Sequence, residues 1–396
     1  MIRYGGMSKG LSILSLIILA AFLSLFHGFA GIFIKNASLV MVPFIWVGKD
    51  LIIENIFGGF PWCLAGYSQY QNLYFIQVAE IGGVHLVTFL LICFNILVYR
   101  LIRDFRHREI RIPIIAALLV SLSCVYTVGY FLYQSGMSRT DPLKTHRAGI
   151  IQPNTGNDPI SREEKLGILG RLFAESRVLA REGAEFIIWP EHTVSIYPLQ
   201  NQIEYDLFTR FVKSNVPLLA GFTDFNDNGK IYNSAVLFDK DGVEKYDKVH
   251  LTPFGEYILF RKILFFVKRI TDEIADFTPG AAVRNLSIHS HAISTPICYE
   301  VIFPELVRKF VSSGGELMVT ISNDSWFGNT SAPYQHLSMA VFRCIENRRY
   351  LLRSTTNGIS AVVNPGGEIL YQSPYNTADR FMGSFKYIKQ RTFFTW

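Results

Sequence analysis

Three ionisable side chains, far apart in the sequence, carry the chemical groups that covalent acyl transfer requires. Glu191 comes two residues after Trp189, Lys248 lies in the polar stretch YDKVH, and Cys298 ends the expected strand 294–297. Side chains just beyond a strand stand at the edge of a sheet, where reactive groups are common. A thiol can act as a nucleophile, a carboxylate beside an aromatic wall as a general base, and an ammonium as the partner of an oxyanion.

Each of these residues, taken alone, is also compatible with an ordinary role. Cys298 fits a buried structural cysteine, Glu191 fits a solvated strand end, and Lys248 fits a surface lysine. The combination favours a site, because nucleophile, proton shuttle and oxyanion stabiliser form a complete set. We therefore interpret the three as a catalytic triad that converges around one carbonyl carbon.

The elements that must position these groups lie in residues 145–385, where short apolar segments alternate with helix-period stretches. Ser161 and Glu164 form a capping box that predicts the start of a helix ending near residue 181. This alternation is typical of a layered α/β domain, and residues 386–396 follow it as a C-terminal tail. Strands are expected at 148–152, 185–189, 216–222, 231–238, 291–297, 317–322 and 355–363, and further helices at 303–312 and 334–349.

Residues 1–140 have a different character, because long apolar runs dominate them. The whole chain is 49% hydrophobic and only 18% charged, which is too apolar for an ordinary soluble protein. The shorter run 37–48 is either a short membrane span or an interfacial segment, so three or four spans are expected. The runs long enough to cross a bilayer are 11–34, 74–99 and 112–133.

The segment between the last two long runs is rich in arginine, which predicts a cytoplasmic loop. The α/β domain would then lie on the other side of the membrane. Four spans would place the N-terminus outside as well, although it carries Arg3 and Lys9; three spans, or spans missing upstream, would remove this conflict. The basic residues of the loop are Arg100, Arg103, Arg106, His107, Arg108 and Arg111.

Charge and cysteine content exclude several other classes of protein. The formal net charge is +6, but no run of basic residues interleaved with aromatics indicates a nucleic-acid partner. The cysteines show neither a CxxC pair nor the spacing of metal ligands. Neither a disulfide framework nor a metal site is predicted.

Four segments resemble the signatures of the nitrilase (carbon-nitrogen hydrolase) superfamily, in the form found in bacterial apolipoprotein N-acyltransferases. They are FIIWPEH, YDKVHLTPFGEY, STPICYE and SNDSWFG, in the family's order, and GGFPW with GYSQ upstream resembles the family's membrane part. The resemblance implies a four-layer αββα sandwich after a helical transmembrane region, with Glu191 as base, Lys248 as oxyanion stabiliser and Cys298 as nucleophile. It also implies a second glutamate, Glu256, that orients the lysine. The supporting positions are Tyr299, Glu300, Asn323 and Trp326.

The same resemblance implies an N-acyltransferase of the bacterial inner membrane, with its catalytic domain on the periplasmic side. A phospholipid would donate a fatty acyl group to Cys298 as a thioester, and the N-terminal amino group of a diacylglyceryl-cysteine apolipoprotein would accept it. The chemistry needs no cofactor. Two alternatives stay open: a membrane-tethered amidase with the same triad, and a degenerate paralogue without catalytic activity.

Residues 254–270 mix aromatic and aliphatic side chains with basic ones, which favours an interfacial lid over the site; an amphipathic helix packed on its own domain is the alternative.

The sequence departs from the family's pattern in its number of spans and in one tryptophan. Its members usually carry more spans before the α/β domain and one after it, and a tryptophan expected near the first strand is not evident after Asn154.

Overall fold

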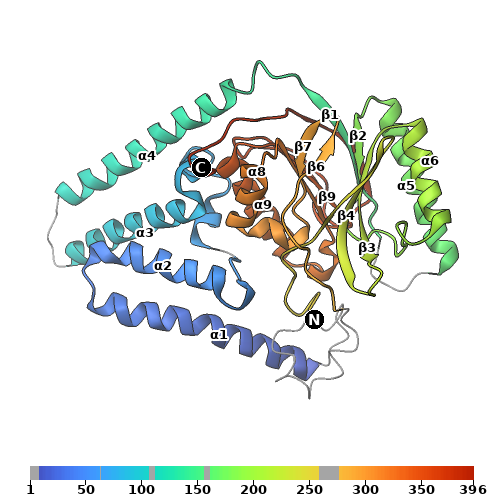
Figure 1. The fold of residues 1–396 in the computed structure, drawn as a ribbon. Helices are drawn as coiled ribbons and strands as arrows, with labels where there is room; N and C mark the ends of the chain where they lie inside the picture. The colour runs from blue at the N-terminus through green and yellow to red at the C-terminus, as the bar shows by residue number, and fades with distance from the viewer. Residues whose placement is uncertain (1–8, 63, 107–111, 156–160, 258–275) are drawn as a thin grey trace.

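The helices of the N-terminal region stand on one side of two packed β-sheets (Figure 1). The computed structural model describes residues 9–62, 64–106, 112–155, 161–257 and 276–396. Part of the arginine-rich loop, at 107–111, and most of the expected lid, from residue 258 onwards, lie outside the described residues.

The N-terminal region contains α1 (Lys9–Asn36), α2 (Val42–Asn55), α3 (Ala79–Arg106) and α4 (Ile112–Ser138). Within the described part of the chain, three helical stretches are long and apolar enough to cross a membrane. The undecided run 37–48 leads into α2, whose 14 residues extend only roughly 21 Å and so fall short of the hydrocarbon thickness. The spanning stretches are Ile13–Asn36, Phe75–Phe105 and Ile112–Ser138.

The α/β domain is built on two mixed six-stranded sheets with orders β12-β1-β2-β3-β4-β5 and β11-β10-β9-β8-β7-β6. The first contains β1 (His146–Gln152), β2 (Phe186–Ile188), β3 (Leu218–Phe225), β4 (Ile231–Asp239), β5 (Gly242–Asp247) and β12 (Asp379–Phe385). The second contains β6 (Leu286–Ile288), β7 (His291–Ser294), β8 (Leu317–Ser322), β9 (Leu351–Thr355), β10 (Ala361–Val363) and β11 (Ile369–Gln372).

Strand alternation divides the apolar side chains between the layers. Ile188 and Val319, one from each sheet, belong to the core between the sheets. Ile187 faces a second core, which lies between the first sheet and the two helices that cover it. The expected four-layer αββα sandwich is confirmed. Its outer helices are α5 (Arg162–Arg181) and α6 (Gln202–Ser214) over one sheet, and α8 (Pro304–Ser312) and α9 (Ala332–Asn347) over the other.

Two local expectations have clear outcomes. The predicted capping box starts α5, because Ser161 Oγ accepts from the Glu164 amide and the Glu164 carboxylate accepts from the Ser161 amide. The strand expected over 291–297 is shorter, since β7 ends at Ser294 and only an isolated bridge at Ile297 continues it. Pro296 has no N–H to donate to the ladder, which accounts for the early end.

Helix α3 is broken where the α/β domain packs against it. Gly82 and Gly83 leave the helical conformation, and Gly83 has a φ of 64°, which favours glycine. The break frees two main-chain groups that find partners elsewhere: the Val84 amide donates to Glu346 at 2.9 Å, and the Glu80 carbonyl accepts from the Phe394 amide at 2.9 Å. The kink therefore results from insertion of the α/β domain and the tail into the helix ladder.

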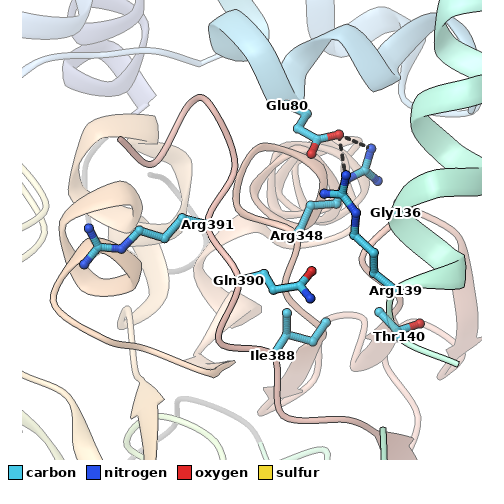
Figure 2. A pocket seen from close by; sticks show the side chains of 8 residues that line it. All are labelled: Glu80, Gly136, Arg139, Thr140, Arg348, Ile388, Gln390 and Arg391. Atoms are coloured by element: carbon cyan, nitrogen blue, oxygen red, sulfur yellow. Dashed lines mark hydrogen bonds and ion pairs between the residues drawn. The ribbon is translucent and has the colours of Figure 1, made fainter. Parts of the chain in front are cut away.

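Arg348, just after α9, ties this domain to two of the apolar helices. Its guanidinium donates to Glu80 of α3 at 2.6 and 3.0 Å and to the Leu132 carbonyl of α4 at 3.3 Å. Figure 2 shows the Arg348 guanidinium bonded to Glu80, and both side chains line a small pocket at this junction. Gly136 makes room for it, because a Cβ there would lie 2.9 Å from the guanidinium carbon.

The variant Arg348→Leu is expected to lower the free energy of unfolding by about 3–5 kcal/mol, because it leaves the buried Glu80 carboxylate without its cation. The double variant with Glu80→Leu should recover part of that loss. Thermal unfolding of the full chain in one detergent measures both. If the double variant lost as much stability as Arg348→Leu, or more, the uncompensated Glu80 carboxylate would not be the cause of the loss.

Candidate functional site

The sequence-predicted residues Glu191, Lys248 and Cys298 stand in the connections that follow β2, β5 and β7. Glu191 is 4% exposed and Lys248 is 1% exposed, so both charges are buried, whereas Cys298 keeps part of its surface open. The fold brings all three into one cluster, in which Glu191 and Lys248 both act electrostatically on the Cys298 thiol.

The Lys248 ammonium lies between two carboxylates at unequal distances. Its Nζ is 2.9 Å from Glu256 Oε2 and 3.8 Å from Glu191 Oε1. Burial acts to lower the pKa of Lys248, but Glu256 and Glu191 outweigh it and raise that pKa above its usual value. Burial likewise opposes ionisation of Glu256, yet Lys248 holds the pKa of that carboxyl below its usual value. Both groups are therefore charged at neutral pH.

An asparagine that the sequence analysis did not single out bridges the two carboxylates. Asn233 Nδ2 donates to Glu191 Oε1 at 2.7 Å and to Glu256 Oε1 at 2.6 Å. The main-chain N–H of Asn323 donates to Glu191 Oε2 at 2.8 Å, and the main-chain N–H of Thr252 donates to Glu256 Oε2 at 2.7 Å. Both carboxylates are thus held at both oxygens.

The thiol stands on a tight turn. Cys298 has a φ of 50°, in the left-handed region that non-glycine residues rarely adopt. Burial raises the pKa of the Cys298 thiol, and the Glu191 carboxylate raises it further, while Lys248 acts to lower it. The resting thiol is therefore protonated and needs a neighbouring base before it can attack a carbonyl.

Glu300 joins the turn that carries the thiol to the turn that carries the lysine. Its Oε2 accepts from the Ile297 amide at 2.8 Å, and its Oε1 accepts from the Val249 and His250 amides at 2.8 and 3.0 Å. Tyr246 Oη donates to the same Oε1 at 2.8 Å. Burial raises the pKa of Glu300 to about 7 in spite of these donors. Glu300 thus links the two turns through hydrogen bonds to their main-chain amides.

A loop from the N-terminal region reaches the same cluster. His250 Nε2 donates to the Gly58 carbonyl at 2.7 Å, and Tyr299 Oη donates to the Gly59 carbonyl at 3.2 Å. Gly59 has a φ of 76°, and a Cβ there would lie 2.0 Å from the Glu54 carbonyl oxygen, so the loop requires glycine at this point. Residues 58 and 59 therefore lie against the neighbours of Lys248 and Cys298.

The remaining predicted residues lie at different depths. Asn323 caps the short turn after β8, because its side chain accepts from the Ser325 amide. Trp326, on the same turn, is 58% exposed and stands at the surface, outside the buried cluster. Among the described residues, no group of three His, Cys, Asp or Glu side chains is arranged to hold a metal ion.

Opposite charges near the thiol predict opposite pH shifts in its reactivity. Removing the negative charge in Glu191→Gln should move the pH profile of Cys298 alkylation by iodoacetamide to lower pH. Removing the positive charge in Lys248→Met should move it to higher pH, each by about one unit. Mass spectrometry of the Cys298 peptide measures both, with near-UV circular dichroism to confirm folding. Shifts in the same direction would contradict this electrostatic arrangement.

The variant Asn233→Leu removes two charge-assisted hydrogen bonds from buried carboxylates, so it is expected to cost about 3 kcal/mol or more of stability. The control Asn347→Leu removes one bond from another buried asparagine to the neutral Arg343 carbonyl and should cost about 1 kcal/mol. Thermal unfolding compares the two. A smaller loss for Asn233→Leu than for the control would be inconsistent with the bridging role.

Both the N-terminal helices and the α/β domain are similar to known protein families. Residues 147–382 match the carbon-nitrogen hydrolase family, and residues 1–97 match the apolipoprotein N-acyltransferase N-terminal domain. Apolipoprotein N-acyltransferase of Geobacter metallireducens is 33% identical over 387 residues, which cover 94% of this chain and 74% of that protein. The proteins of the same name from Vibrio cholerae and Haemophilus influenzae are 29% and 30% identical, over 94% of this chain and 75% and 74% of theirs.

A match to both domain families, together with a relative 33% identical over nearly the whole chain, places this protein in the apolipoprotein N-acyltransferase family.

Proposed function

We propose that this protein transfers a fatty acyl group from a membrane phospholipid, through a thioester on Cys298, to the N-terminal amino group of a diacylglyceryl-cysteine apolipoprotein. One observation carries the proposal: the partly open thiol lies with a buried carboxylate and ammonium, and His250 and Tyr299 beside them bond to a loop that follows the short helix α2. A site walled by such a loop is suited to a substrate held in a bilayer.

In the first half-reaction, Glu191 takes the proton from Cys298 as the sulfur attacks the ester carbonyl carbon. The carbonyl oxygen becomes an oxyanion opposite the Lys248 ammonium. Collapse of this intermediate breaks the carbon–oxygen bond, and the lysophospholipid leaves with the proton that Glu191 held. The acyl group remains on sulfur as a thioester.

In the second half-reaction, the acceptor's neutral amine attacks the thioester carbonyl and Glu191 takes a proton from its nitrogen. The carbon–sulfur bond breaks, the amide leaves, and the proton returns to the Cys298 sulfur. Glu256 stays ionised throughout and keeps Lys248 in place, because its oxygen is the nearer of the two carboxylates.

The positive-inside rule supports an orientation with the α/β domain on the periplasmic side of a multi-pass inner-membrane protein. Arg100, Arg103 and Arg106 end α3 on the opposite side, so α4 returns the chain outward. In Figure 1, α1 and α3 run in the same direction and α2 returns the chain between them, so the Lys9 end of α1 lies on the same side as the α/β domain. The basic residue Lys9 therefore stands against the positive-inside rule at that end, whereas the arginines that end α3 agree with it.

The test is the intact mass of the purified full chain after incubation with vesicles of dipalmitoyl phosphatidylethanolamine. One added palmitoyl group is expected, with none in Cys298→Ser. The control Cys344→Ser should keep the adduct, because Cys344 is a buried cysteine on α9 whose thiol donates to the Ala340 carbonyl. A synthetic diacylglyceryl-cysteine peptide should then remove the palmitoyl group.

Two results would overturn the proposal. Ammonia released from soluble amides, without any lipid adduct, would establish the membrane-tethered amidase instead. An adduct that persists in Cys298→Ser would place the acyl group on another residue.

A further inference from the structure

The positive φ of Cys298 must be stabilised by residues outside the proposed triad. A non-glycine residue in the left-handed region costs free energy and persists only when its surroundings hold it there. The flanking groups are held: the Ile297 amide donates to Glu300 at 2.8 Å, and the Pro296 carbonyl accepts from Thr320 Oγ1 at 2.7 Å. The carbonyl of Cys298 itself is held by His336.

His336 lies on α9 and is fully buried. Its Nε2 is 3.1 Å from the Cys298 carbonyl oxygen, which can only accept, so Nε2 must carry a hydrogen. Burial and the nearby Arg353 lower the pKa of His336, which favours the neutral ring. Nδ1 then accepts from Arg353 Nη2 at 3.0 Å, and this bond fixes the tautomer that donates to Cys298.

The groups behind the imidazole are themselves held. Asp324, which lies 3.2 Å from His336 Nδ1, accepts from Arg353 Nη2 at 2.8 Å and from Ser322 Oγ at 2.6 Å. Arg353 Nε also donates to the Ile359 carbonyl at 3.2 Å. The imidazole is therefore backed by a rigid, buried ion pair.

The other side of the ring is covered by the loop from the N-terminal region. The Trp62 ring centroid lies 5.9 Å from that of His336, and the Phe327 centroid lies 5.7 Å from it. Trp62 Nε1 donates to Gln335 Oε1 at 2.8 Å, which fixes the indole on the start of α9. Water is thus kept from the bond between His336 and Cys298 by residues of both parts of the chain.

We propose that His336 is a positioning residue for the reactive thiol, because its Nε2–H holds the Cys298 carbonyl and so keeps the turn in the conformation that aims the sulfur at Glu191 and Lys248. This inference rests on the proposed nucleophilic role of Cys298. His336 does not exchange a proton with the substrate; it acts only through the main chain of residue 298.

The test compares His336→Gln with His336→Asn, two amides that differ by one methylene. The Gln amide nitrogen can reach the place of Nε2 and donate to the carbonyl, whereas the shorter Asn amide cannot. Iodoacetamide alkylation of Cys298 in the full chain should fall roughly tenfold or more in His336→Asn, because a small misplacement of a reacting atom is costly. It should stay within about threefold of the parent in His336→Gln, with the pH profile unshifted.

The matched control is Thr320→Val, which removes the bond to the Pro296 carbonyl and leaves the Cys298 carbonyl held. Its alkylation rate should resemble that of the parent. Equal rates in the Asn and Gln variants, or an equal loss in Thr320→Val, would overturn the proposal. Alkylation needs no lipid, so a positioning failure is distinguishable from a failure of the acyl-transfer function, which the intact-mass experiment alone reports.

Discussion

The buried ammonium of Lys248 is the constraint on which the rest of the site depends. A cation taken out of water costs several kcal/mol unless opposite charges and hydrogen bonds compensate it, and Lys248 is only 1% exposed. Glu256 and Glu191 supply the charge, and Asn233 with two main-chain amides keeps the carboxylates from moving apart. The positive charge is therefore in place before a substrate arrives, which is the condition under which electrostatic stabilisation of an oxyanion requires little reorganisation.

Apolar packing and main-chain hydrogen bonds join the two parts of the chain into one structure. Residues of α3 and of the turn before it, such as Phe75 and Val84, share a hydrophobic core with Phe342 of α9, and the break in α3 is completed by Glu346 and by the tail. The loop that follows α2 then lies against His250 and Tyr299, which are the neighbours of Lys248 and Cys298. The helices thus act on the geometry of the site as well as on its location.

Sequence reasoning predicted the charged residues of the site and the layered fold because each depends on a local pattern. Glu191 and Cys298 follow expected strands, Lys248 lies in a conspicuous polar stretch, and the alternation of strands and helices is visible without the partner segments. Asn233 was missed because it lies inside β4, and the only local signal is a polar side chain in a strand that is otherwise buried. β12 was missed for a different reason: it pairs with β1, where His146 faces Phe385, and a pairing between such distant segments leaves no trace in a short window. β6, at three residues, is too short to show a period.

Glu191 and Glu256 lie at unequal distances from the Lys248 ammonium, and this difference assigns them different roles in the proposed reaction. Glu256, at 2.9 Å, is the partner that fixes the ammonium, and its depressed pKa keeps it from taking the thiol proton. Glu191, at 3.8 Å, interacts more weakly with the ammonium, so the charge of Lys248 can turn towards a forming oxyanion while Glu191 receives a proton. Protonation of Glu191 then removes the negative charge that raised the pKa of the Cys298 thiol. In the proposed reaction, the proton transfer that creates the thiolate therefore also lowers the free-energy cost of keeping it, and the thiol would stay protonated until a carbonyl carbon is present to react with it.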